Sequence, residues 1–432
     1  MIEILNIIIQ NIVFILLSYC GVYSLLTLNN KKINISYEII ISSLLNNFLF
    51  SLLLIWFCFL FNFNKEHFFI LILIFNFFCI FFCTLKKNIF NSKNIIIISL
   101  IFTLCSVLSV DVAYNLLTSH DARKFHIVNA TIYYENFFVK DITYKNEYPQ
   151  FGNYLWAFFW KNSLLKIEYF GRLSYVYIYI ISLIYLFSSL KIDNFYKILL
   201  TLIALVLSYQ EKYFDGRTDI LVFSILSIIT KNLYDFFYNK EYKKLNSFEF
   251  LISLNLLLWL KSECLLYVIS IYLAIIFFFK GNQKTKIFFT FYFLLIILTR
   301  LIFIFYYNLP FNPNVETFDI NIIPVSNIYD VLYRSSLIFF WYLANLLKNP
   351  LMIINFLCFY FLIFNFKVKI KEFYFLIFIF FINSIVIYLT FLFTKYSFPS
   401  HLIGSLDRII YQTSSLFLIP TFYLINKYFK KI

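Results

Sequence analysis

Long apolar runs, separated by short polar breaks, follow one another along the whole chain. Many of these runs approach or exceed the roughly 20 residues that cross a hydrocarbon core as a helix. We therefore predict an all-α integral membrane fold with about 13 spans. The approximate boundaries are 7–28, 39–61, 68–85, 95–112, 173–190, 198–210, 219–237, 249–261, 263–279, 287–307, 350–366, 373–394 and 408–426. Residues 7–28 follow no basic leader and contain no small-residue cleavage site, so we expect a retained helix.

The lysine-rich breaks fall on one side of this arrangement, and the positive-inside rule makes that side cytoplasmic. They hold Lys31/Lys32, Lys86/Lys87/Lys93, Lys191/Lys197, Lys240/Lys243/Lys244, Lys280/Lys284/Lys286, Lys367/Lys369/Lys371 and Lys427/Lys430/Lys431. Two long connections, about 113–170 and 308–349, then face outward, and we expect short helices in the first. Loops of this length usually carry a function. We expect the amphipathic stretch 327–349 of the second to lie along the outer surface, with a further crossing as the alternative.

Composition supports a membrane location. Of the 432 residues 62% are hydrophobic and only 13% charged, and the mean hydropathy is +0.81. A soluble domain carries about 25% charged residues. The net charge of +14 is explained by lysine in cytoplasmic loops and not by nucleic-acid binding. The seven cysteines form no CxxC pair and lie almost entirely in apolar runs, where we expect small core side chains.

Arginine and histidine are distributed against the positive-inside tendency. All six arginines and all four histidines fall in outer loops or at the outer ends of predicted spans: Arg123, Arg172, Arg217, Arg300, Arg334, Arg408, His67, His120, His126 and His401. Cations kept on that face indicate anionic partners there, either carboxylates or a ligand phosphate.

Several polar stretches on the outer side are candidates for a site. In "LLTSHDARKFHIVNA" (116–130), Asp121 precedes a segment of helical spacing, so we expect it near a helix start. "LWLKSECLLY" interrupts about 30 apolar residues with Lys261 and Glu263, which forces a turn, and ionisable groups at that depth are functional candidates. "HLIGSLDRII" places Asp407 and Arg408 at the expected start of the last span, with Ser405 or Asp407 as its N-cap.

These stretches, taken in order, carry a family resemblance. "SHDARKFH", "YPQFGNYLWA", "GRLSY", "YFDGRTDILVFSIL", "LKSECLL" and "HLIGSLDRII" resemble blocks of the GT-C membrane glycosyltransferases, in the protein O-mannosyltransferase and aminoarabinose-transferase-like branch (glycosyltransferase family 39 and its relatives). The resemblance covers about residues 95–425. It divides the chain into N-terminal transmembrane helices (1–94) and a GT-C-like catalytic module (95–432). It implies transfer of a sugar from a polyprenyl-phosphate carrier to a glycan, lipid or protein acceptor, on the extracytoplasmic face of a bacterial inner membrane.

Transfer from a phosphate leaving group needs one base for the acceptor hydroxyl and fixed cations where negative charge develops. Carried over to the blocks that show the resemblance, this chemistry implies that Asp121 is the general base of an inverting displacement. Arg408, Lys261 and either Arg172 or Arg217 would bind the carrier phosphate. Glu263 and Asp219 would orient these cations or the sugar, and Arg123 and His126 would line the substrate site. We expect neither a cofactor nor a metal ion.

Two other classes remain open. A polysaccharide polymerase or ligase would use polyprenyl-diphosphate glycans and a later, arginine-rich outer loop. A transporter or flippase would need inverted repeats and charges near the middle of the bilayer. In this chain the first long loop, and not a later one, is the richest in ionisable groups, which disfavours the polymerase or ligase. The sequence shows no inverted repeats and its charges gather on one side of the predicted arrangement, which disfavours the transporter.

Overall fold

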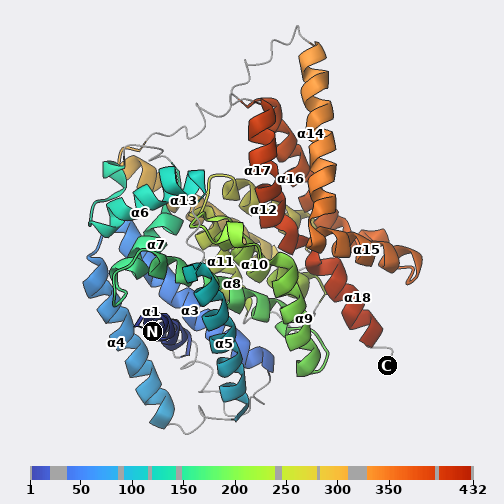
Figure 1. Ribbon diagram of the computed structural model, residues 1–432. Helices are drawn as coiled ribbons and strands as arrows, with labels where there is room; N and C mark the ends of the chain where they lie inside the picture. Colours follow the sequence, from blue (N-terminus) through green and yellow to red (C-terminus); the bar gives the residue numbers. More distant parts are fainter. Residues whose placement is uncertain are drawn as a thin grey trace.

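The computed structural model describes residues 2–19, 37–85, 92–114, 119–142, 148–238, 246–279, 283–309, 328–394 and 398–429. Every regular element in these segments is a helix (Figure 1). The cytoplasmic lysines expected at 31–32, 86–87, 240–244, 280 and 430–431 lie outside the described residues, as does the part of the expected second outer loop at 310–327.

Among the described residues, four helices precede the expected first outer loop, and short helices lie within the loop itself. The four are α1 (Ile2–Tyr19), α3 (Tyr37–Leu60), α4 (Lys65–Leu85) and α5 (Ser92–Tyr114). The loop contains η1 (Ala122–His126), α6 (Ile127–Tyr134), η2 (Val139–Asp141) and α7 (Phe151–Lys161). Short helices in this loop are therefore confirmed.

The described residues from 169 onward form a further succession of helices. They are α8 (Tyr169–Ser188), α9 (Asn194–Ser208), η3 (Glu211–Tyr213), α10 (Asp219–Tyr238), α11 (Asn246–Leu258), α12 (Cys264–Phe278), α13 (Gln283–Tyr306), α14 (Ile328–Lys348), α15 (Pro350–Phe364), η5 (Ile370–Phe373), α16 (Tyr374–Leu392), α17 (Phe398–Ser414), η6 (Ser415–Leu418) and α18 (Ile419–Phe429). In Figure 1, α14, α16 and α17 run side by side and project beyond the other helices.

A helix overlaps each predicted span, so the all-helical prediction is confirmed, but the number of crossings is not. Among the described residues, six helices are long and apolar enough to cross a membrane. Helices α14 and α15 pass the same test only as a pair, and they meet at an angle of 86°. If this bent pair is counted as one span, the described residues contain up to seven candidate spans. Helices α9, α11 and α12 are apolar but shorter than a full crossing.

The interior of the protein is organised around α8 and α10. Helix α8 is buried along its whole length, and α10 packs against α8, α11 and α17. Glycine allows α7 to approach this pair closely. A Cβ atom on Gly171 of α8 would lie 2.2 Å from the backbone oxygen of Trp156, and one on Gly152 of α7 would lie 2.2 Å from Cγ2 of Thr218. Because Thr218 directly precedes α10, this contact fixes α7 beside the start of that helix.

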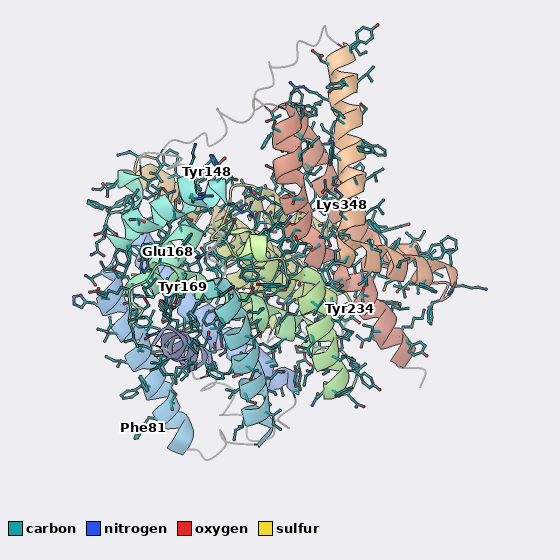
Figure 2. All side chains as sticks on the ribbon, viewed as in Figure 1. Phe81, Tyr148, Glu168, Tyr169, Tyr234 and Lys348 are labelled. Atoms are coloured by element: carbon teal, nitrogen blue, oxygen red, sulfur yellow. The ribbon has the colours of Figure 1, made fainter. Side chains whose placement is uncertain are left out.

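Outer helices present apolar side chains away from the interior. Phe81 on α4 is 60% exposed, and Phe291 and Phe305 on α13 are exposed to a similar degree. Figure 2 shows Phe81 at the periphery of the molecule. Apolar surface on this scale is unfavourable in water but suits contact with lipid. Together with the long apolar helices, it is the surface of a helical membrane protein.

The last predicted span begins earlier than expected. Helix α17 starts at Phe398, so Asp407 and Arg408 lie in its interior and not at its first turn. The expected N-cap role of Ser405 or Asp407 is therefore wrong. The aromatic residue before Pro399 starts the helix, and Pro is favourable in a first turn because no intrahelical bond needs its nitrogen.

A second polar cluster lies in the far half of α10. The Lys231 ammonium group is fully buried, 2.9 Å from Asp235 and 3.3 Å from Glu38 on α3. Next to it, Glu249 of α11 accepts hydrogen bonds from Asn46 and Tyr185. The expectation that the ionisable groups gather on one side is therefore wrong. An isolated charge would be too costly here, and these groups are accommodated because they pair inside the bundle.

Candidate functional site

Five ionisable residues that are distant in sequence meet at the first turn of α10. Asp219 is the first residue of α10, Lys261 and Glu263 lie in the break between α11 and α12, and Arg408 projects from α17. Asp121 lies in the short helical turn just before η1, in the loop between α5 and α8. We call this group, with Gln412 one turn after Arg408, the Asp219 network.

Asp219 is the centre of the network and is completely buried. Its Oδ1 accepts from the Nζ of Lys261 at 2.7 Å and from the side-chain amide of Gln412. Its Oδ2 lies 3.1 Å from the Nε and 3.0 Å from the Nη2 of Arg408. The hydroxyl of Tyr267 donates to Oε1 of Gln412 at 3.1 Å, which orients the amide. A buried carboxylate is tolerated here because two cations and an amide satisfy both of its oxygens.

Asp121 is the exposed end of the network. Its Oδ2 accepts from the Nη1 of Arg408 at 2.9 Å, while its side chain remains 58% exposed. The expected position near a helix start is confirmed, but the carboxylate makes no capping hydrogen bond. Arg408 therefore bridges a buried acid and an exposed one, and it fixes the exposed acid relative to α10.

Two ion pairs flank the network. Lys212 is 2.7 Å from Asp407, and Arg217 is 3.0 Å from Asp215. Asp215 also accepts from the backbone nitrogen of Ser119 at 3.3 Å, which ties the loop before α10 to the turn that carries Asp121. The backbone of Gly216 has φ of +99°, a conformation that other residues rarely adopt.

His126 connects the network to the start of α7. Its Nδ1 is 2.8 Å from Oδ1 of Asn153, and the amide of Asn153 donates to Oε1 of Gln150 at 2.6 Å. Burial lowers the pKa of His126 to about 4, and the Asn153 hydrogen bond opposes this shift only in part. His126 is thus neutral at physiological pH and acts as a hydrogen-bonding group.

Besides Arg217, which pairs with Asp215, two further predicted cations are not members of the network. Arg172 is buried in α8, 2.9 Å from Glu168, and its guanidinium lies 5.7 Å from the ring centre of Trp156. This position holds α8 against α7 and contributes no contact to Asp219 or Asp121. Arg123 is exposed on η1, two residues after Asp121.

Sequence reasoning missed the amide residues of the site. Gln412, Asn153 and Gln150 complete the hydrogen bonding around the charged groups. Their one sequence signal is spacing. Gln412 follows Arg408 by four residues, which places both on one face of a helix. Asparagine is so frequent in this chain that no single one stands out.

The charges of the network do not balance. Three carboxylates (Asp121, Asp219 and Glu263) face two cations, Lys261 and Arg408. The cations nevertheless retain hydrogen-bonding capacity. Arg408 uses three of its five N–H groups on carboxylates, and Lys261 uses two of its three. Among the described residues, two N–H groups of Arg408 and one of Lys261 thus remain without a carboxylate partner.

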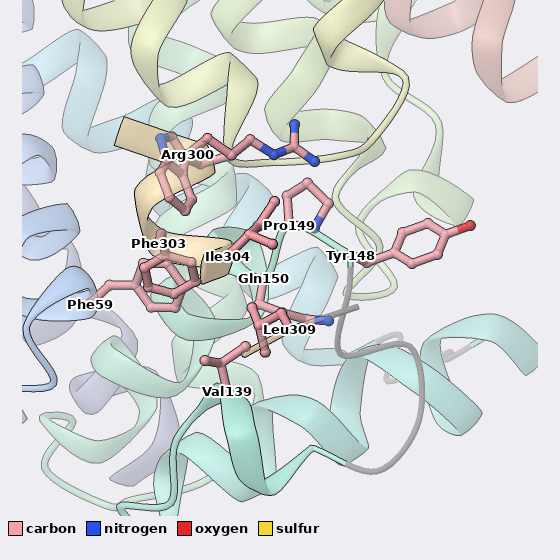
Figure 3. A pocket seen from close by; sticks show the side chains of 10 residues that line it. Phe59, Val139, Tyr148, Pro149, Gln150, Arg300, Phe303, Ile304 and Leu309 are labelled. Carbon is pink, nitrogen blue, oxygen red and sulfur yellow. The ribbon is translucent and has the colours of Figure 1, made fainter. Parts of the chain in front are cut away.

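A small pocket, with a cavity volume of about 10 Å³, lies next to the network (Figure 3). Gln150 and Trp259 form part of its lining, and Arg300 of α13 is its one charged residue. The backbone oxygen of Trp259 accepts from the nitrogen of Phe151 at 3.2 Å, and Lys261 follows two residues later. The pocket and the network therefore share the segment between α11 and α12.

The described residues include no group of three or more His, Cys, Asp or Glu side chains arranged to hold a metal ion. Comparison with protein-family models, curated proteins and solved structures finds no match for this chain. The functional assignment therefore depends on the site alone.

Proposed function

We propose that this protein is a membrane glycosyltransferase of GT-C type, which moves a sugar from a polyprenyl-phosphate carrier to an acceptor hydroxyl by an inverting displacement. The Asp219 network is the observation that carries the proposal. Five charged residues from four separate parts of the chain converge at one end of α10 and leave a single carboxylate, Asp121, more than half exposed.

Asp121 is the group in this network best placed to act as a base. Asp219 is buried and its oxygens are occupied by Arg408, Lys261 and Gln412, so it has no capacity to accept a proton from a substrate. Asp121 gives one oxygen to Arg408 and is exposed, so its carboxylate can receive the acceptor's proton as the hydroxyl attacks the anomeric carbon. The bond from that carbon to the phosphate oxygen breaks in the same step.

The remaining donors of Arg408 and Lys261 can stabilise the departing phosphate. Because phosphate is a good leaving group, no general acid is needed, in contrast to glycoside hydrolysis. Asp219 holds the two cations in place, so little free energy is needed to reorient them when negative charge develops on the phosphate. Glu263 then positions Lys261, which it approaches to 3.3 Å.

The test is a transfer assay with purified protein in lipid nanodiscs. A panel of polyprenyl-monophosphate sugars serves as donors, and mass spectrometry measures release of the polyprenyl phosphate. An oligosaccharide-diphosphate carrier is included because a polymerase or ligase would use it instead. We expect turnover of a monophosphate donor and inversion at the anomeric centre of the product, read by NMR.

Asp121→Asn should reduce the rate about 10²- to 10⁴-fold, the usual contribution of a general base. Asp407→Asn is the matched control, because Asp407 is a neighbouring acid that pairs with Lys212 and not with the network. We expect this control to retain activity. Full activity of Asp121→Asn would contradict the proposed base, and turnover of the diphosphate carrier alone would contradict the proposed donor.

A further inference from the structure

Asp121 and His126 lie at the two ends of one irregular helical turn. In η1 the backbone nitrogen of Ile127 donates to the oxygen of Ala122, a hydrogen bond that spans five residues, as in a π-helix. Asp121 and His126 are also five residues apart. In a regular α-helix their side chains would be about 140° apart around the axis, whereas the wider π-turn brings them to nearly the same face. Such turns occur frequently at functional sites.

A chain of side-chain amides decides which ring nitrogen of His126 carries the proton. Asn153 and Asn129 donate through their side-chain nitrogens to Oε1 of Gln150, at 2.6 and 3.2 Å. The oxygen of Asn153 is therefore the atom that faces Nδ1 of His126, at 2.8 Å. Because an amide oxygen only accepts, Nδ1 carries the proton of the neutral ring and donates it, while Nε2 keeps an acceptor lone pair.

Nε2 is the atom through which His126 can contact a ligand. It has no hydrogen-bond partner among the described residues, although His126 is only 6% exposed. Burial has the largest effect on the pKa of the ring, followed by the Asn153 hydrogen bond. The charges of Lys261, Asp219 and Arg408 act on this pKa next, so the ring lies within electrostatic reach of the Asp219 network. A ligand hydroxyl can donate to Nε2, whereas a phosphate oxygen has no proton to offer it.

We propose that Nε2 of His126 accepts a hydrogen bond from a hydroxyl group of the transferred sugar, and that Asn153 is a positioning residue that holds the ring in the tautomer able to accept it. The inference rests on the proposed transfer reaction and adds a determinant of sugar specificity to it. In that reaction Lys261 and Arg408 donate to phosphate oxygens, whereas His126 selects for a hydroxyl. A sugar that lacks this hydroxyl leaves a nearly buried acceptor unpaired and is disfavoured.

NMR tests the tautomer without any substrate. The chain has four histidines, so protein labelled with nitrogen-15 histidine gives four sets of ring signals, and His126→Asn identifies the set of residue 126. We expect a neutral ring protonated at Nδ1 in the wild type at neutral pH. Asn153→Asp places a carboxylate beside Nδ1, which favours the imidazolium form, so both ring nitrogens should then carry protons. A neutral wild-type ring protonated at Nε2 would overturn the proposal.

Transfer kinetics in nanodiscs test the contact with the sugar. The donors are farnesyl-phosphate mannose, glucose and galactose, each with its monodeoxy forms. In the wild type, removal of one particular hydroxyl should lower kcat/KM about ten- to a hundredfold. His126→Asn keeps a side-chain donor for Asn153 but does not reach as far as Nε2. It should therefore no longer distinguish the parent sugar from that deoxy form, and Asn153→Asp should behave in the same way.

His401→Asn is the matched control, because Nδ1 of His401 is likewise 2.8 Å from a neutral side-chain oxygen, that of Thr394. It should discriminate as the wild type does. Each measurement is a ratio between two donors, so a partial loss of folded protein does not alter it. If His126→Asn discriminates among the deoxy sugars like the wild type, the inference is wrong while Asp121 remains the proposed base. If no monophosphate donor is turned over, the proposed function is wrong, and the sugar contact with it.

Discussion

Replacing Asp219 by Asn tests whether the network holds the N-terminal end of α10 in place. The substitution keeps the shape of the side chain but removes the buried negative charge between Lys261 and Arg408. Breaking a buried ion pair from one side usually costs 3–5 kcal/mol, because the remaining charge stays buried without its partner. Lys261 keeps Glu263 and Arg408 keeps Asp121. We therefore expect the lower end of this range, about 3 kcal/mol.

The cysteines provide the assay. Cys58, Cys105 and Cys264 are buried, so a thiol-reactive fluorescent dye reports their exposure as the protein unfolds in detergent. A loss of about 3 kcal/mol lowers Tm by several degrees in a chain of this length. Asp407→Asn breaks a partly exposed pair and should lower Tm by no more than a degree or two, since such pairs contribute up to about 1 kcal/mol.

A second variant checks the electrostatic reason for the effect. Adding Lys261→Met to Asp219→Asn removes one of the two cations left without a buried partner, so the double variant should be more stable than the sum of the single effects predicts. If Asp219→Asn unfolds at the same temperature as Asp407→Asn, Asp219 does not organise these cations. Strict additivity would likewise contradict the contact between Asp219 and Lys261.

Three further predictions follow from buried groups. The pKa of His126 is about 4 in the folded protein against 6.5 in an unfolded chain, so His126 stabilises the fold above pH 6.5 and this stability is lost as the pH falls toward 4. Between pH 7 and pH 5 the loss is about 2 kcal/mol, and the Tm of wild type should fall more than that of His126→Gln over this range. Lys231→Met should lower the free energy of unfolding by about 3–5 kcal/mol, because it leaves Asp235 buried without its cation. A Tm unchanged from wild type would show that the Lys231–Asp235 ion pair does not form. Gly171→Val should prevent recovery of folded protein in detergent, because its Cβ would overlap the backbone of Trp156; a normal gel-filtration profile would show that α7 and α8 can separate.

The helices were predictable because their signal is the length of apolar runs, and a helix overlaps every predicted span. The number of crossings was not predictable in the same way. An apolar run of 13 to 15 residues, as in α11 and α12, reads like a span in the sequence but forms a helix too short for a full crossing. The right-angle bend between α14 and α15 at Asn349-Pro350 depends on tertiary packing, which the pattern does not contain.

The meeting of Asp121, Lys261, Glu263 and Arg408 could be anticipated, because all four lie at ends of apolar segments on the same side of the predicted arrangement. Which cation contacts which acid could not be read from the sequence. Arg172 had the same apparent position as Arg408, yet the structure directs it to Glu168.

The two polar clusters of α10 use similar groups in different surroundings, and this difference argues for their separate roles. By the rise of a helix, Asp219 and Asp235 are about 24 Å apart along α10. At the Asp235 end, Lys231 and Glu249 are fully buried, and the contacts there are made between helices α3, α8, α10 and α11. A cluster of this kind fixes how the helices are set against one another, because any shift along their axes would leave a charge unpaired. At the Asp219 end the buried pairs lead through Arg408 to an exposed carboxylate. Of these two clusters, only the Asp219 network combines rigidity with access, which supports the proposal that it is the site of substrate chemistry.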